Sequence, residues 1–422
     1  MIHSSRLEYS LIRGNMLNRK LYTERIKPFI NRPLVKVVSG VRRCGKSTLL
    51  KLLAVELRSS GVPDENIISV NKELMEFDSI KDYKDLYKYI KNTPTTKGKN
   101  RYLFLDEPQE IDGWEKAVNS LLAEEFADIY ITGSNSRMLS SELATLLSGR
   151  YVQASMLPLG FSEFLEFRST RRTADLDYEF EIFLKYGGLP GIHSLPLEDE
   201  IIFQFLNAIY NTVIVKDITT RHHIRDIAQF ERITRYLFDN CGNITTAKKI
   251  TDFFRSQAQR VSVDTVQNYM SFLQDAHLIY KCPRFDIKGK RHLELYEKYY
   301  ASDLGIRHSV LGYKKNDIAG LLENVVFLEL IRRGYRVSTG KVDNLEVDFV
   351  AEKDAERLYI QVCYLLASPE TEEREFSSLE KIDDNYPKIV LSMDKHWGSN
   401  RNGIVRQHIM DFLLITPAGS TR

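Results

Sequence analysis

The stretch VKVVSGVRRCGKSTLLKLL, residues 35–53, constrains the possible fold of this chain more than any other. An apolar run typical of a buried strand leads into a Gly-bounded turn, and a leucine-rich helical pattern follows. The residues from Gly40 to Ser47 fit the pattern G-x-x-x-x-G-K-[ST] in full. Glycines there let backbone N–H groups point at phosphate oxygens, and the following helix adds the positive end of its dipole. Because the motif follows a strand and opens a helix, it predicts a phosphate-binding loop rather than a chance match.

Each part of this loop has an expected role in binding ATP and Mg²⁺. Lys46 should reach the β- and γ-phosphates, and the Ser47 hydroxyl should bind Mg²⁺. Cys44 could be a small buried side chain or a thiol that makes ATP binding redox-sensitive, and the sequence leaves both interpretations open. The predicted nucleotide-binding residues of the loop are Gly40, Arg42, Arg43, Cys44, Gly45, Lys46, Ser47 and Thr48.

A second apolar run, YLFLDE, ends in the two acids that a hydrolytic site requires. Asp106 is expected to hold Mg²⁺ through its water shell, and Glu107 to polarise the attacking water. The alternative is an ordinary solvated acidic turn, which is the interpretation favoured for Glu110 and Asp112. The phosphate loop earlier in the chain favours the hydrolytic role for the first two acids.

Further candidates for catalysis follow the strand predicted in IYITGSN. Ser134 at its end is expected to sense the γ-phosphate and the water, although a strand-to-loop turn would contain the same residue type. Arg150, or Arg137 nearer the strand, could act as an arginine finger in its own site or across a subunit interface. Surface arginines are common, so the sequence alone does not decide between these roles.

Bulk composition excludes several classes of protein. A chain of 422 residues is long enough for two to four domains at roughly 100–200 residues each, and 43% of its residues are hydrophobic. The net charge of +2 disfavours a general polyanion binder, so any contact with nucleic acid must come from local patches. Four cysteines without a CxxC pair fit a reducing, cytoplasmic location. We expect no signal peptide. We also expect no apolar stretch that approaches the roughly 20 residues of a membrane-spanning helix.

The order of motifs is similar to that of bacterial and archaeal AAA+-type ATPases whose C-terminal half is a domain of unknown function. The resemblance rests on GVRRCGKST, LFLDE, ITGSNSRML, SGRY, LPLGFSEFLEF and YGGLPGI, and it continues through ENVVFLELIRRGY, LEVDF and IQVCYLL. It covers nearly the whole chain. It implies an α/β P-loop NTPase core of the additional-strand, catalytic-glutamate type, which binds and hydrolyses ATP on a mostly parallel sheet.

The resemblance also implies one more nucleotide contact and a division into domains. Related switch-type ATPases contact adenine through a Gly-x-Pro in a helical lid, and Gly188-Leu189-Pro190 matches it, with Pro190 at the base. A simple hinge turn is the alternative. The expected parts are an N-terminal helical extension (1–33), a P-loop ATPase core (34–170), a helical lid (171–225), a winged-helix domain (226–312) and a nuclease-like domain (313–422).

Residues 226–312 are expected to form a winged helix. Val266, Met270 and their helical neighbours form an apolar face, and two strands joined by KGKRH resemble a wing with a basic tip. Lys288, Lys290 and Arg291 at that tip could grip a DNA phosphate. The outward helix face carries no arginine-rich pattern, so packing or protein contact is the other interpretation.

The last block resembles the PD-(D/E)xK nucleases, with chemical groups missing. Glu323 matches the helix acid and Asp348 the acid of a strand. The next strand carries Gln361 and Cys363 where these nucleases have Glu and Lys, so both a metal ligand and a charge are absent. A degenerate nuclease-like site at Glu323, Asp348 and Gln361 is therefore expected.

Three functional hypotheses follow. The first is an ATP- and Mg²⁺-dependent ATPase acting as a nucleotide-driven switch, associated with double-stranded DNA or a protein partner. The second is an ATP-regulated nuclease, which the missing groups disfavour. The third is a non-hydrolysing ATP-bound regulator, which the Asp106–Glu107 pair disfavours.

Overall fold

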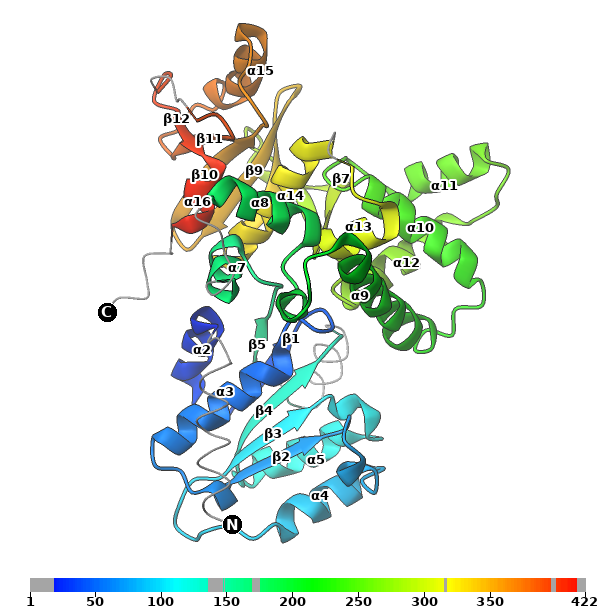
Figure 1. The fold of residues 1–422 in the computed structure, drawn as a ribbon, viewed down its shortest axis with the longest axis vertical. Coiled ribbons are helices and arrows are strands. Elements are labelled where there is room, and N and C mark those ends of the chain that lie inside the picture. The colour runs from blue at the N-terminus through cyan, green and yellow to red at the C-terminus, as the bar shows by residue number, and fades with distance from the viewer. Residues whose placement is uncertain are drawn as a thin grey trace. The chain divides into compact units, whose positions relative to one another are not determined.

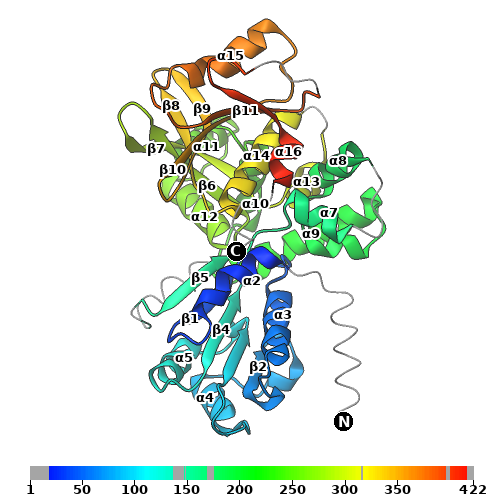
Figure 2. The ribbon, with the colours of Figure 1, turned by 90° about the vertical axis from the view of Figure 1, so that its left-hand side faces the viewer.

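The computed structural model describes residues 19–135, 147, 149–168, 175–314, 317–395 and 400–415, without the side chains of residues 294 and 295. The chain divides into two compact units, and each is considered separately. The first comprises Met1–Met156 with Asp275–His277, and the second comprises Leu157–Gln274 with Leu278–Arg422. Figures 1 and 2 follow the chain from blue at its N-terminus to red at its C-terminus.

Five strands of the described first unit form one parallel sheet in the order β2-β3-β4-β1-β5. Their bounds are β1 (Val35–Ser39), β2 (Ile67–Asn71), β3 (Tyr102–Asp106), β4 (Asp128–Gly133) and β5 (Tyr151–Ser155). Strands β1 and β3 are buried along their whole length, as expected for a parallel sheet covered on both faces. Strand β4 separates the strand before the phosphate loop from the strand that ends in the acids, which is the additional-strand arrangement.

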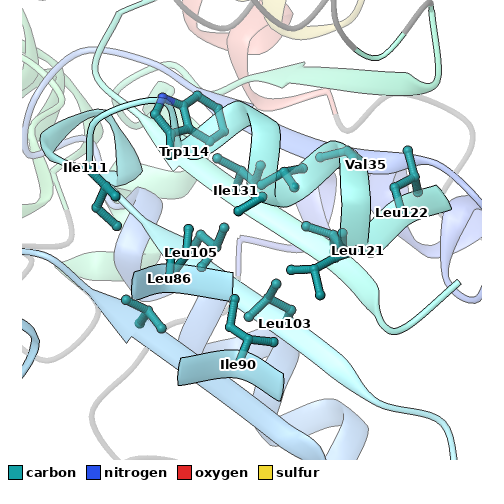
Figure 3. Packing of buried hydrophobic residues seen from close by; sticks show 14 of the residues in the cluster. Val35, Leu86, Ile90, Leu103, Leu105, Ile111, Trp114, Leu121, Leu122 and Ile131 are labelled. Atoms are coloured by element: carbon teal, nitrogen blue, oxygen red, sulfur yellow. The ribbon is translucent and has the colours of Figure 1, made fainter. Parts of the chain in front are cut away.

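Helices cover the two faces of this sheet, with α3 on one face and α4 and α5 on the other (Figure 2). The helix bounds are α2 (Lys20–Ile26), α3 (Lys46–Ser59), α4 (Tyr83–Asn92) and α5 (Trp114–Ala123). Leu86, Ile90, Trp114 and Leu121 from α4 and α5 pack on buried strand residues such as Leu103 (Figure 3). Of the expected N-terminal extension, the described part holds α2 and the short 3₁₀ turn η1 (Lys27–Phe29).

The second unit begins with a mostly helical part. It comprises α7 (Phe161–Phe167), α8 (Leu176–Tyr186), η6 (Pro190–Ser194), α9 (Asp199–Thr212), η7 (Val213–Thr219), α10 (Ile227–Asp239), α11 (Ala247–Ser256), α12 (Val263–Asp275) and α13 (Leu304–Leu311). Side chains cap α10, α11 and α13, since Asp226, Thr246 and Asp303 each accept a hydrogen bond from a backbone N–H in the first turn. The apolar face expected on α12 is buried at Val266, Tyr269, Met270 and Leu273, whereas Val263 is 37% exposed.

The remaining strands of the described second unit form one mixed sheet in the order β12-β11-β10-β9-β8-β6-β7. Their bounds are β6 (Ile279–Asp286), β7 (Arg291–Ala301), β8 (Arg336–Val342), β9 (Leu345–Lys353), β10 (Glu356–Val362), β11 (Lys388–Ser392) and β12 (Val405–His408). The accompanying helices are α14 (Ile318–Arg332), α15 (Pro369–Glu380) and α16 (Ile409–Leu414). Because β6 pairs in parallel with β8, the two strands of the expected wing belong to the same sheet as the nuclease-like segment.

One helical stretch in the described part of the chain, Asp199–Thr219, is long and apolar enough to cross a membrane by length and composition. The expectation that no stretch approaches this length was therefore wrong here. Of its most apolar window, 44% is buried inside the fold, and α9 packs against α13. A core helix of a soluble protein passes the same test, so this stretch is weak evidence for a membrane span.

Candidate nucleotide-binding site

The phosphate loop connects β1 to α3 in a conformation that requires both of its glycines. Gly40 has φ 155° and Gly45 has φ 109°. A Cβ on Gly40 would lie 2.2 Å from the backbone oxygen of Met156, and one on Gly45 would lie 3.3 Å from the Met156 side chain. The chain leaving β5 therefore passes against the loop and leaves no room for a larger residue at position 40.

Lys46 lies at the first position of α3 and is 5% exposed. Its Nζ donates hydrogen bonds to the backbone oxygens of Gly40, at 3.0 Å, and Val41, at 3.3 Å. The nearest carboxylate oxygen recorded for it is Glu107 Oε1, at 3.9 Å. The ammonium is thus held inside the loop mainly by neutral oxygens.

Asp106 ends β3 beside the loop and is 8% exposed. Its carboxylate accepts a hydrogen bond from the hydroxyl of Thr132, and the Ser47 hydroxyl lies near it. Burial raises the pKa of Asp106, and these two hydroxyls and Lys46 oppose that shift. The structure therefore places the predicted pair of Mg²⁺ ligands, Ser47 and Asp106, beside each other.

Glu107 follows Asp106 in a left-handed conformation, with φ 52° and ψ 50°. This conformation is uncommon for a residue other than glycine. Its Oε2 accepts a hydrogen bond from the Gln109 side chain and another, at 3.4 Å, from the Ser134 hydroxyl. The structure thus brings Lys46, Glu107 and Ser134 together.

Two polar residues of this site, Thr132 and Gln109, were missed by sequence reasoning. Thr132 lies directly opposite Asp106 in the β3–β4 register. Residues that end neighbouring parallel strands lie at one edge of a sheet, so the strand alignment could have identified it.

Other predicted loop residues take different positions. Thr48 and Arg43 are exposed, and Arg43 has a positive φ of 67°. Arg42 pairs with Glu73 at 3.4 Å. Cys44 is fully buried, and burial raises the pKa of its thiol, which favours the interpretation as a small buried side chain over a reactive thiolate.

The structure does not bring Arg150 to the phosphate loop of its own chain. Its backbone oxygen accepts a hydrogen bond from Val35 N, at the beginning of β1, whereas the loop follows Ser39 at the end of that strand. At about 3.3 Å per residue these two ends lie roughly 13 Å apart. The Arg150 side chain is exposed and donates to Asn119 at 3.1 Å. Arg137 lies outside the described residues.

The turn that contains Gly188 and Pro190 is held within the second unit by a carboxylate that sequence reasoning missed. Asp303 Oδ2 accepts a hydrogen bond from Gly188 N at 2.7 Å, and its Oδ1 accepts one from Ile306 N at 2.9 Å. A Cβ on Gly187 would lie 2.4 Å from that carboxylate, so glycine is required there. Burial raises the pKa of Asp303 to about 6 although backbone N–H groups oppose the shift. Asp303 therefore positions the turn that precedes Pro190.

The basic tip between β6 and β7 is partly neutralised by nearby acids. Lys288 Nζ lies 2.7 Å from both carboxylate oxygens of Asp343, and Arg291 lies 4.0 Å from Asp286. Lys290 is exposed. These ion pairs reduce the positive charge that this tip could offer to a phosphate backbone.

The nuclease-like residues come together around a lysine that the sequence analysis did not include. Lys298 on β7 lies 2.8 Å from Glu323 and 3.8 Å from Asp348, measured from Nζ to a carboxylate oxygen. Gln361 accepts a hydrogen bond from the backbone N of Asp348 at 3.3 Å. Within the described residues no group of three or more His, Cys, Asp or Glu forms a metal site. The predicted Mg²⁺ site at Ser47 is of another kind, because it combines a hydroxyl, a carboxylate and phosphate oxygens.

Comparison with known proteins supports an ATPase-type domain in the unit that contains the phosphate loop. An AAA domain matches residues 32–165, and a domain of unknown function (DUF8612) matches residues 178–317. An uncharacterized protein of Haemophilus influenzae is 37% identical over 402 residues, which cover 94% of this chain and 99% of that protein. The chain belongs to the same protein family. A further relative in Methanocaldococcus jannaschii, also uncharacterized, is 33% identical over 387 residues, covering 86% of this chain and 82% of that protein.

A solved structure extends the comparison to the fold. The Walker-type ATPase of Pyrococcus abyssi aligns with a TM-score of 0.51 and 14% identity, over 71% of this chain and 97% of that one. At this identity the likeness concerns the fold alone. Together with the AAA domain, it shows that this family has the P-loop ATPase fold.

Proposed function

We propose that this chain binds ATP with Mg²⁺ and hydrolyses it, and that the bound nucleotide acts as a switch on the second unit. The observation that carries the proposal is the convergence of four groups at one sheet edge. Ser47 lies beside Asp106, and Lys46 lies 3.9 Å from Glu107. A P-loop ATPase needs these residue types in this arrangement.

The roles of the residues follow from their chemistry. Backbone N–H groups of the loop cradle the phosphates, and Lys46 exchanges its loop carbonyls for phosphate oxygens. The Ser47 hydroxyl and the Asp106 carboxylate, both oxygen donors, would hold Mg²⁺, which neutralises charge on the β- and γ-phosphates. Glu107 accepts a proton as a water oxygen bonds to the γ-phosphorus and the bond to ADP breaks. Ser134, hydrogen-bonded to Glu107, fixes the direction of that carboxylate.

The second unit supplies the proposed responding elements. We assign residues 171–225 to a helical lid, residues 226–312, which end with β6, β7 and α13, to a winged-helix domain, and residues 313–422 to a nuclease-like domain. Pro190 in the lid would contact the adenine base, and the bond from Gly188 to Asp303 supports a fixed turn for that purpose. Arg150 lies far from the phosphate loop of its own chain. We therefore propose that, if Arg150 acts as an arginine finger, it does so in the ATP site of a second copy of the chain.

The test is ATP turnover by the full chain, with and without duplex DNA. Glu107→Gln should bind ATP and lose turnover, whereas Glu110→Gln, which changes an exposed acid three residues away, should keep it. Stimulation by DNA would support a DNA-associated switch. Binding of ATP without turnover in the parent chain would refute hydrolysis and favour a non-hydrolysing regulator.

A further inference from the structure

A buried ammonium lies among three carboxyl groups in the mixed sheet. Lys298, on β7, is 3% exposed. Its Nζ lies 2.7 Å from Glu346 Oε1, 2.8 Å from Glu323 Oε1 and 3.8 Å from Asp348 Oδ1. The carboxyl groups come from two elements distant from β7 in sequence, α14 and β9. Charge neutralisation by one lysine thus links three parts of the fold.

Further hydrogen bonds fix the carboxyl groups around this ammonium. Tyr300, which is fully buried, donates to Glu323 Oε1 at 2.5 Å, and Val362 N donates to Asp348 Oδ2 at 2.8 Å. Burial and then Glu323 raise the pKa of Asp348 well above its usual range. Burial alone would lower the pKa of Lys298, but Glu323, Asp348 and Glu346 outweigh it and raise that pKa. The lysine is therefore held in its charged form.

The three oxygens that surround Lys298 Nζ are the kind that Mg²⁺ or Mn²⁺ prefers. A divalent ion would need the same oxygens at about 2.1 Å, within the space that the ammonium fills. Two positive charges so close in a buried site would repel each other strongly. We propose that Lys298 is an internal counter-ion in the position of a divalent cation, and that a cation site appears when its charge is removed. This inference does not depend on the ATPase proposal.

Gln361 also helps to keep a divalent cation out of this cluster of carboxyl groups. Its Oε1 accepts from Asp348 N, and its Nε2 donates to Glu375 Oε2 at 3.0 Å. A glutamate at position 361 would place a carboxylate against Glu375, with no proton between them. The amide therefore fits its neighbours, and both of its polar atoms are used away from the ammonium. On this basis the parent chain should bind no divalent ion at Asp348.

The test is Mn²⁺ binding by the full chain without nucleotide, followed by electron paramagnetic resonance. All proteins carry Asp106→Asn, which removes the carboxylate of the ATP site. Lys298→Met should bind one additional Mn²⁺ per chain, at least tenfold more tightly than the parent, and Asp348→Asn should abolish that gain. Lys281→Met is the matched control, because this lysine on the neighbouring strand β6 is 43% exposed and, within the described part of the chain, forms an ion pair only with Glu297.

Two outcomes would overturn the proposal. The first is a Lys298→Met protein that folds, as judged by circular dichroism, and binds no more Mn²⁺ than Lys281→Met. The second outcome concerns proteins that keep Lys298. It would be Mn²⁺ binding by the parent chain, or Mn²⁺-dependent nicking of plasmid DNA, that disappears in Asp348→Asn. If Lys298→Met does not fold, this second measurement still decides, since the proposal requires the parent and Asp348→Asn to behave alike.

Discussion

Each unit of this protein places a buried lysine beside acids at the edge of a sheet, but the partners of the two ammonium groups differ. Lys46 donates to two backbone carbonyls of its loop, and the nearest recorded carboxylate oxygen lies 3.9 Å away. Lys298 has two carboxylate oxygens within 2.8 Å and a third at 3.8 Å. The two lysines are thus buried to a similar extent, but carboxylates at short distance neutralise only the charge of Lys298.

This difference determines which lysine can bind a ligand. Neutral carbonyls compensate for the lost hydration of Lys46 but leave its charge available to an incoming phosphate. Carboxylates neutralise Lys298 within the fold, so an external anion would have to compete with them. We therefore propose that Lys46 is a ligand-binding group, whereas Lys298 is an internal structural group.

The largest expected effect tests whether the first lysine serves a hydrolytic site. Glu107→Gln keeps the shape of the side chain but cannot accept the proton of the attacking water. Turnover should fall by about 100-fold or more, with ATP affinity nearly unchanged, measured by phosphate release and by equilibrium binding. Equal turnover in Glu107→Gln and Glu110→Gln would show that Glu107 is not the catalytic base and that Lys46 does not serve a hydrolytic site of this kind.

The next effect tests the structural role of Lys298. Lys298→Met leaves the buried Asp348 and the partly buried Glu323 and Glu346 without their counter-ion, which should lower the free energy of unfolding by about 3–5 kcal/mol. Lys281→Met on the neighbouring strand should cost about 0–1 kcal/mol, because its ion pair is exposed. Urea denaturation measures both. Similar losses in the two variants would contradict the internal counter-ion role.

A third change asks whether Lys46 is a binding group rather than a structural one. Lys46→Met removes a charged donor to phosphate, so ATP affinity should fall roughly 10- to 100-fold, at about 1.5–3 kcal/mol for such a hydrogen bond. Its effect on stability should be well below that of Lys298→Met. If Lys298→Met weakened ATP binding as much as Lys46→Met, the division of roles would be wrong.

The smallest effect is a pH dependence of the Lys298→Met deficit. Lys298 lowers the pKa of Asp348, which burial and Glu323 raise, so the variant should raise that pKa further. A raised folded-state pKa gives stability that is present at low pH and lost as pH rises through it. The deficit relative to the parent should therefore widen as pH rises above the usual pKa of a carboxyl group, as measured by urea denaturation at a series of pH values. A constant deficit would show that Asp348 does not sense the ammonium.

The sequence predicted the phosphate loop and the two acids because each group is contiguous in the chain. Lys46 follows Gly45 directly, and Asp106 and Glu107 adjoin at the end of one apolar run. Local chemistry is enough to recognise such groups. Thr132 was within reach of the same reasoning, because strand register alone places it opposite Asp106.

The groups that the sequence did not predict are those joined only by tertiary structure. Asp303 meets Gly188 across more than a hundred residues, and Lys298 meets Glu346 only because β6 pairs with β8. No spacing rule connects these positions. The nuclease motif has its lysine at the position of Cys363, whereas the positive charge beside Glu323 and Asp348 comes from Lys298 on β7.

The parallel pairing of β6 with β8 has a consequence for how this protein can change over evolutionary time. Strands on both sides of residues 302–335 share one hydrogen-bonded sheet, and the ammonium on β7 neutralises acids on α14 and β9. A recombination event within that interval would separate a charge from its counter-charges and a strand from its neighbour. The strand pair β6–β7 and the sheet that follows should therefore be inherited together, as one exchangeable piece.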